Sequence, residues 1–133
     1  MIVVAGVDGS DHTHQVVETA LEFAAGGETH CVYVANGTIY PYAVPAGVVV
    51  DYAAIEKSQE EAVWQKVGRL PTNAEQVTLQ GSPALSLVDY AKNVEADLIV
   101  VGSRGRGSFG ALLLGSVSHG VVHNSDRNVL IVR

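Results

Sequence analysis

Residues 102–116 read GSRGRGSFGALLLGS, and the rest of the chain is organised around this glycine-rich stretch. It follows the apolar run at 98–101 and precedes 117–122, so it predicts a loop that joins a buried strand to a helix. Glycine lets backbone N–H groups approach an anion closely, and the start of a helix adds unpaired donors and the positive end of a dipole. The stretch therefore predicts a phosphate or nucleotide site, with a surface loop between capped helix ends as the alternative.

The same alternation of strand and helix patterns runs through the whole chain. Apolar runs predict further strands at 2–5, 30–34, 75–79 and 129–132. Helical patterns follow the first strand, cover 51–70, follow Pro83 and cover 117–122. Five strands that alternate with four helices predict one α/β domain over 1–133, Rossmann-like, with an open five-stranded parallel sheet and helices on both faces.

A few residues predict the ends and buried faces of the helices. Ser10 or Asp11 is expected to cap the first helix, and Ser82 and Pro83 suit the start of the third. Residues 51–70 form the clearest amphipathic pattern, and Pro71 is expected to end it. Its expected buried stripe comprises Ile55, Ala62, Val63, Val67 and Leu70, with Trp64 as a packing residue.

The composition argues against several classes of protein. The 133 residues are 47% hydrophobic and 17% charged, which suits one folded domain rather than a disordered chain. The net charge of −6 argues against general binding to nucleic acid or to anionic membranes. Cys31 is the single cysteine, which excludes an intramolecular disulfide, and no signal peptide or membrane-spanning run is visible. A cytoplasmic protein is expected.

Asp8 is the acidic residue that the pattern places at the ligand-binding edge of the sheet. It follows the first strand, and ligands of open parallel sheets bind beyond the carboxyl ends of the strands, where the strand order reverses. A carboxylate in that position can accept hydrogen bonds from ribose hydroxyls or from an amino group, or help to hold a divalent cation. An aspartate that caps the following helix is the alternative.

The glycine spacing resembles the nucleotide-binding signature of the universal stress protein family, G-x2-G-x9-G-[ST]. Gly102, Gly105, Gly115 and Ser116 fill all of its positions. The chain is also similar to that family at 7–10, 81–83, 96–102 and 129–133, so the resemblance covers almost its whole length. Because the signature is complete, the chain resembles the ATP-binding branch, whose fold is that of adenine nucleotide alpha hydrolase-like domains.

This resemblance implies a ligand and a set of residues that hold it. The ligand is ATP, with AMP or ADP as alternatives, accompanied by Mg²⁺ or Mn²⁺, and the resemblance implies no catalytic residue. Gly6 and Asp8 would contact the nucleoside, and the backbone of Val34 would contact the adenine, so no side chain is assigned to reading the base. The ribose and phosphates would be held by Val101, Gly102, Arg104, Gly105, Gly115, Ser116, Val117 and Ser118.

The chain departs from the family pattern at three positions. Gly6 stands where some ATP-binding relatives have a proline, Tyr33 where a histidine is frequent, and Asn128 where a proline opens the last strand. None of these changes removes a residue of the signature. A further glycine, Gly120, is expected to weaken the last helix by about 0.5–1 kcal/mol relative to alanine.

Two other functions stay open on the sequence. An enzyme would need a positioned water and base or a second substrate site, and Asp8 is the one acidic residue that can be assigned to the binding edge. At most slow ATP hydrolysis or a nucleotidyl-transfer reaction is therefore expected. The other function is an interaction protein without nucleotide, because relatives commonly form dimers and residues 129–132 could pair with those of a second copy in a homodimer.

Several smaller features carry hypotheses of their own. The long loop at 35–50, with Tyr40 and Tyr42, could cover a base, join a subunit interface or pack on the surface. The apolar residues 111–114 are a candidate dimer contact. His119 and His123 have a spacing that suits a metal ion, but a solvated role is favoured because no third ligand is evident. Cys31 is expected in the core.

Overall fold

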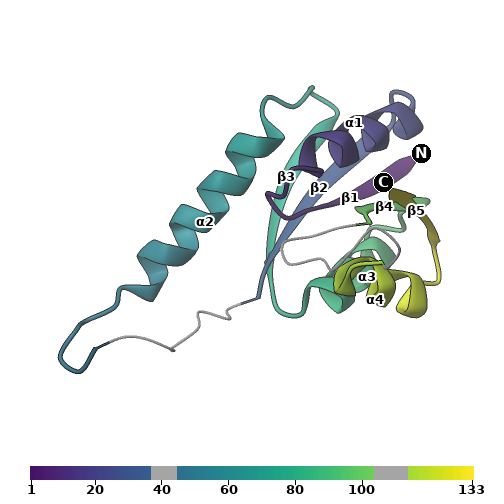
Figure 1. Ribbon diagram of the computed structural model, residues 1–133. Helices are drawn as coiled ribbons and strands as arrows, with labels where there is room; N and C mark the ends of the chain where they lie inside the picture. The colour runs from purple at the N-terminus through teal and green to yellow at the C-terminus, as the bar shows by residue number, and fades with distance from the viewer. Residues whose placement is uncertain (37–44, 104–113) are drawn as a thin grey trace.

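Strands and helices alternate along the chain in a computed structural model that describes residues 1–36, 45–103 and 114–133 (Figure 1). All strand pairs are parallel, and the five strands lie in the order β3-β2-β1-β4-β5. The predicted fold is therefore confirmed. The elements are β1 Ile2–Val7, α1 Thr13–Ala24, β2 Glu28–Ala35, α2 Tyr52–Val67, β3 Ala74–Gln80, α3 Pro83–Asn93, β4 Leu98–Gly102, α4 Ser116–Asn124 and β5 Asn128–Val132.

Each face of the sheet is covered by two helices, and the alternation of side chains along β1 separates the two cores. Val3, Ala5 and Val7 pack with α1 and α2, whereas Val4 packs with α3 and α4 on the opposite face. Both cores are built mainly from small and β-branched apolar residues, which suit a central parallel strand. Cys31 is fully buried in the first of these cores, as expected.

The strand order reverses between β1 and β4. From β1 the chain moves outward to β2 and then to β3, and after α3 it returns to the other side of β1 to form β4 and β5. Because all strands are parallel, their carboxyl ends share one edge of the sheet. At that edge the turn after β1 lies beside the end of β4, which is where open α/β sheets bind ligands.

The start of α1 differs from the prediction. The residue before the helix is His12, and neither it nor Ser10 or Asp11 caps the helix with a side-chain hydrogen bond. The carboxylate of Asp11 instead lies 3.1 Å from Lys66 Nζ on α2, so it joins two elements rather than ending one. Ser10 contributes its backbone carbonyl, which accepts a hydrogen bond of 3.1 Å from the Thr13 N–H.

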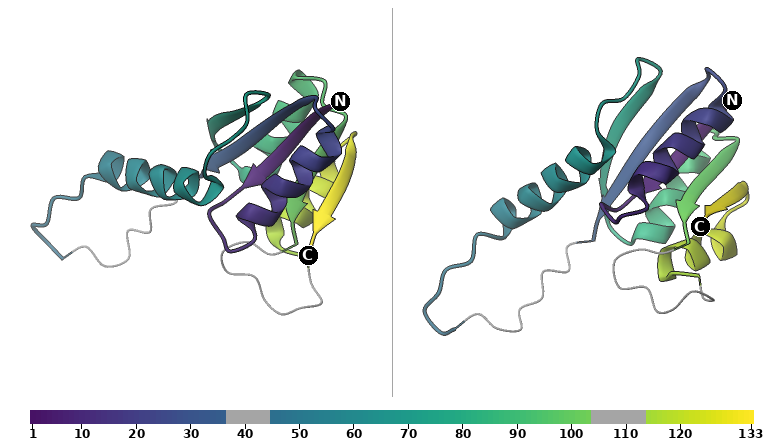
Figure 2. Two further views of the ribbon diagram at one scale, coloured as in Figure 1. Left: turned by 90° about the horizontal axis from the view of Figure 1, so that it is seen from above. Right: turned by 45° about the horizontal axis from the view of Figure 1, so that its top comes forward.

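The prediction for α2 was wrong in its end and in two of the five residues of its buried stripe. The helix ends at Val67 and not before Pro71, because Gly68 follows it with a φ of +75°. Val63 and Val67 are buried and Trp64 packs beside them, but Ile55 and Ala62 are exposed. The views in Figures 1 and 2 give the reason, because α2 extends beyond the sheet and only its carboxyl-terminal half lies against the body of the protein. Asp51 caps the exposed end by accepting a hydrogen bond from the Ala54 N–H.

Gly120 has a packing role that its sequence context concealed. A Cβ atom at this position of α4 would lie 2.6 Å from the Cβ of Ala84 on α3, which is closer than two non-bonded carbon atoms can approach. The two helices therefore pack against each other through a glycine and an alanine. Gly120 lowers the intrinsic stability of the helix, but it also makes this close packing possible.

Three sequence hypotheses concern other parts of the surface. Tyr40, Tyr42 and residues 111–113 lie outside the described residues, while Leu114 is 43% exposed. His119 and His123 are exposed, and their rings stack with an angle of 5° between the planes. In the part of the chain that the structure describes, no helix has the length and apolar character needed to cross a membrane.

Candidate functional site

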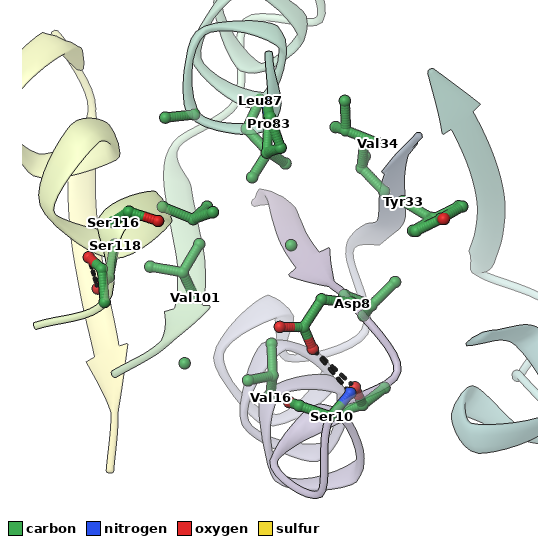
Figure 3. Close-up of a pocket in the computed structure, with 18 of the residues that line it drawn as sticks. Asp8, Ser10, Val16, Tyr33, Val34, Pro83, Leu87, Val101, Ser116 and Ser118 are labelled. Carbon is green, nitrogen blue, oxygen red and sulfur yellow. Dashed lines mark hydrogen bonds between the residues drawn. The ribbon is translucent and has the colours of Figure 1, made fainter. Parts of the chain in front are cut away.

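A pocket of about 560 Å³ opens at the carboxyl edge of the sheet, around the end of β1 (Figure 3). Its volume lies within the range of small-molecule and cofactor sites. Figure 3 shows three groups of side chains around it: Leu87 and Pro83 from α3, Asp8 and Ser10 from the turn after β1, and Ser116 near the start of α4. The pocket therefore occupies the point where the strand order reverses.

The structure brings the expected nucleotide-binding residues together. Arg104 and Gly105 lie outside the described residues, so the structure assigns them no position. Every other residue of the expected set lines the pocket: Gly6, Asp8, Val34, Val101, Gly102, Gly115, Ser116, Val117 and Ser118. They come from β1, β2, β4 and α4 and the turns that follow the strands, so distant stretches of sequence meet only at this edge.

Asp8 is held in place by the turn that leads into α1. Its Oδ1 atom accepts a hydrogen bond of 2.9 Å from the Ser10 N–H, and the hydroxyl of Thr13 lies 3.4 Å from the same oxygen. These contacts orient the carboxylate, and Asp8 remains partly exposed at the pocket. Neither of these bonds comes from a backbone N–H of α1, so Asp8 does not cap that helix, which was the alternative to a ligand-binding role.

The amino-terminal end of α4 brings backbone donors to the pocket. Gly115 precedes the helix with an extended backbone, and no side chain caps the helix. Ser118 is buried, and its hydroxyl donates a hydrogen bond of 3.0 Å to the Gly115 carbonyl, which stabilises the turn into the helix. Because the first amides of a helix have no partner within the helix, this end is suited to an anion.

The side of the pocket below α3 is apolar, and we call it the apolar compartment. Gly6 lies beneath it, where a Cβ atom would be 2.9 Å from Leu87 Cδ1 and 3.1 Å from Val101 Cγ1. The absence of a side chain at Gly6 therefore lets Leu87 pack directly over β1. The residues of the apolar compartment are Gly6, Val32, Val34, Pro83, Ala84, Leu87 and Val101.

Sequence reasoning missed several residues that line the pocket. Ser82, Pro83 and Leu87 come from α3 and the turn before it, and that turn was a detectable signal because it follows a strand at the same edge of the sheet. His12 lies at the start of α1, with its Nδ1 atom 3.2 Å from Gln15 Oε1. Gln59 on α2 also lines the pocket, and no local pattern predicts how far that helix reaches.

The described lining carries little charge. Asp8 is its single carboxylate, and it contains neither lysine nor arginine. Among residues 1–36, 45–103 and 114–133, no group of three or more potential ligand side chains is arranged to hold a metal ion. A cation in this pocket would therefore depend on ligand oxygens as well as on Asp8.

The chain matches the family model described as the universal stress protein family over residues 1–133. A curated relative is a universal stress protein of Bacillus subtilis, YxiE. It is 30% identical over 144 residues, and the match spans 98% of this chain and 97% of the relative.

Two solved structures are similar to this chain over nearly their whole lengths. A universal stress protein in complex with cAMP is 30% identical with a TM-score of 0.65, covering 100% of this chain and 96% of the other. A universal stress protein from Archaeoglobus fulgidus in complex with dAMP is 27% identical with a TM-score of 0.67, covering 99% and 96%. The whole-chain match to the family model and the full-length relatives together show that this chain belongs to the universal stress protein family.

Proposed function

We propose that this protein is an ATP-binding regulatory module that holds the nucleotide in the pocket at the carboxyl edge of its sheet. The observation that carries the proposal is the uncapped start of α4, which meets Asp8 and the apolar compartment in one pocket. These three parts match the three parts of a nucleotide: backbone amides for phosphates, a carboxylate for ribose hydroxyls and apolar walls for the base.

The solved relatives support an adenine nucleotide, since one contains cAMP and another dAMP. The choice of ATP rests on the complete glycine signature, of which Gly102, Gly115 and Ser116 line the pocket. We propose that Mg²⁺ or Mn²⁺ accompanies ATP. Magnesium is commonly held by one or two carboxylates together with phosphate oxygens, and Asp8 suits the protein's share of that arrangement.

The pocket favours binding over rapid turnover. General-base hydrolysis needs a base placed to activate water, and Asp8 already accepts hydrogen bonds from Ser10 and Thr13. We therefore propose at most slow ATP hydrolysis. Rapid hydrolysis that disappears in Asp8→Asn while ATP binding persists would contradict the regulatory role.

A homodimer through β5 is the second part of the proposal. β5 is an edge strand, and each of its apolar residues Val129, Leu130, Ile131 and Val132 is only partly buried. An exposed apolar edge strand can pair with a second copy, and closed two-fold symmetry is the commonest outcome for identical chains.

Native mass spectrometry of the purified protein, before and after addition of ATP and Mg²⁺, tests both parts. We expect a mass increase that corresponds to one adenine nucleotide per chain, in a dimeric species. An unliganded spectrum in both conditions would refute nucleotide binding. A monomer with bound nucleotide would refute only the dimer.

A further inference from the structure

The turn Gly81–Pro83 leads into the pocket, and so far only Pro83 has a part in the proposed function, as a wall of the apolar compartment. The Gly81 N–H donates a hydrogen bond of 3.0 Å to the carbonyl of Ala35, at the end of β2. Gly81 has a φ of +135°, which favours glycine, and Pro83 opens α3 with its restricted backbone. The turn is thus fixed beside the end of β2, where Ala35 follows Val34, which lines the pocket.

Ser82, in the middle of this turn, has a hydroxyl that the helix does not use. Its carbonyl accepts the first helical hydrogen bond of α3, 2.8 Å from the Ser86 N–H. A serine in this position ordinarily bonds the amides of the first turn, but the Ser82 side chain makes no such bond. Within the described residues, the hydroxyl of Ser82 is therefore available to a ligand in the pocket that it lines.

Ser82 is an exposed residue at the margin of the apolar compartment. The apolar compartment next to it is formed by valine, proline, alanine, leucine and glycine residues, and Leu87 and Val101 are almost completely buried. Apolar walls hold a planar base without fixing its orientation, whereas a hydrogen-bonding side chain at the margin selects one edge of the base. Asp8 and the start of α4 belong to the other sides of the pocket (Figure 3).

We propose that Ser82 is the side chain that reads the nucleobase, its hydroxyl accepting a hydrogen bond from the exocyclic 6-amino group of adenine. This inference rests on the proposed function, because it requires an adenine nucleotide in this pocket. It makes Ser82 a specificity-determining residue in addition to the backbone contact expected at Val34.

The test is a thermodynamic cycle in which the Ser82 hydroxyl and the 6-amino group of the ligand are removed singly and together. ATP and purine riboside 5′-triphosphate, which lacks the 6-amino group, are titrated into the wild type and into Ser82→Ala by isothermal titration calorimetry. A neutral hydrogen bond corresponds to a change of about fivefold in affinity. We expect Ser82→Ala to weaken ATP binding about fivefold and to leave binding of the analogue unchanged.

Two further variants separate the contact from a change in the helix. Ser82→Thr keeps a hydroxyl and is expected to retain the preference for ATP. Ser86→Ala removes a hydroxyl one turn later on the same helix, outside the pocket lining, and is expected to change neither affinity. The melting temperature of Ser82→Ala should match that of the wild type, because no capping bond is lost.

Each outcome has a distinct meaning. If Ser82→Ala weakens the binding of both ligands equally, or of neither, Ser82 does not contact the 6-amino group and the inference is wrong. Nucleotide binding itself stands in that case. If the wild type binds the analogue as tightly as ATP, the inference is wrong as well. If the wild type binds neither triphosphate, the proposed function fails and this inference fails with it.

Discussion

The two walls of the pocket use glycine for different physical reasons. At the start of α4, Gly115 leaves the first amides of a helix open to the pocket without a side-chain cap. Below α3, Gly6 leaves room for the side chain of Leu87, and Gly120 on α4, outside the pocket lining, leaves room for Ala84. In the proposed function the first glycine serves the ligand directly, whereas the other two serve the packing around α3. Substitution of Gly115 should therefore change affinity alone, whereas substitution of Gly6 or Gly120 should change stability, and substitution of Gly6 should also change affinity through Leu87.

Gly115→Asp should have the largest effect, on affinity alone. A carboxylate at this position would occupy the amides of α4 and repel phosphate, and like charges in contact cost several kcal/mol. We expect ATP affinity to fall at least about 100-fold, measured by isothermal titration calorimetry. The free energy of unfolding should stay within a few tenths of a kcal/mol or rise, because aspartate is a favourable residue before a helix.

Gly115→Asn is the matched control for this substitution, since it has nearly the same shape without the charge. Its loss of affinity should be clearly smaller than that of Gly115→Asp. Equal losses in the two variants would show that steric blockage, and not electrostatic repulsion, weakens binding at this wall.

Gly120→Ala should be the most destabilising of the packing substitutions. Its Cβ would lie 2.6 Å from the Cβ of Ala84, so α3 and α4 must move apart. Overpacking of this kind costs about 1–3 kcal/mol, which outweighs the gain of about 0.5–1 kcal/mol in helix propensity. Urea denaturation monitored by circular dichroism measures the change in the free energy of unfolding.

The double variant Ala84→Gly with Gly120→Ala exchanges the two residues across the same contact. It should be more stable than expected from the sum of the two single changes, because the close approach is relieved. Strict additivity of the two changes would show that the contact between α3 and α4 does not limit stability.

Gly6→Ala should have a smaller effect on stability and a measurable effect on binding. The new Cβ meets Leu87 Cδ1 at 2.9 Å and Val101 Cγ1 at 3.1 Å, and the end of a leucine side chain can move. We expect a loss of about 1 kcal/mol in the free energy of unfolding and a roughly tenfold loss of ATP affinity, because Leu87 is displaced into the apolar compartment. Adding Leu87→Val should recover part of the lost stability, measured by denaturation, and part of the lost ATP affinity, measured by calorimetry.

Cys31 provides a reference outside both walls, in the core beneath α1 and α2. Burial raises the pKa of its thiol from 9.0 to about 11, so between these values the unfolded chain loses a proton that the folded chain keeps. Stability should therefore fall with rising pH, by about 1 kcal/mol more between pH 8 and pH 10 than in Cys31→Ala. Urea denaturation at each pH measures this difference.

Tyr90 is a second group that affects stability at alkaline pH, and it does so in both the wild type and Cys31→Ala. Burial, followed by the charge of Glu75, raises the pKa of the Tyr90 phenol, which adds to the alkaline loss of stability in both proteins. The difference between the wild type and Cys31→Ala removes this contribution. An identical pH dependence in the two proteins would mean that Cys31 ionises equally readily when folded.

Much of the fold could be predicted from local patterns. The apolar runs, the helical periodicities and the glycine-rich stretch at 102–116 identified all five strands and four helices, because buried parallel strands and helix ends leave strong signals in composition. Asp8 could be placed at the binding edge for the same reason, since its position follows directly from the end of a strand.

Only the tertiary structure decided how the elements meet. The alternation of apolar residues could not show that α2 passes beyond the sheet and leaves Ile55 exposed, because periodicity describes a helix face and not what covers it. The sequence indicates only that Gly120 weakens its helix, whereas the structure shows that it makes room for Ala84 of another helix. Ser82 likewise read as a helix cap until its unused hydroxyl was found at the pocket. Each of these outcomes depends on which distant elements lie nearby in the fold, and no local pattern records that arrangement.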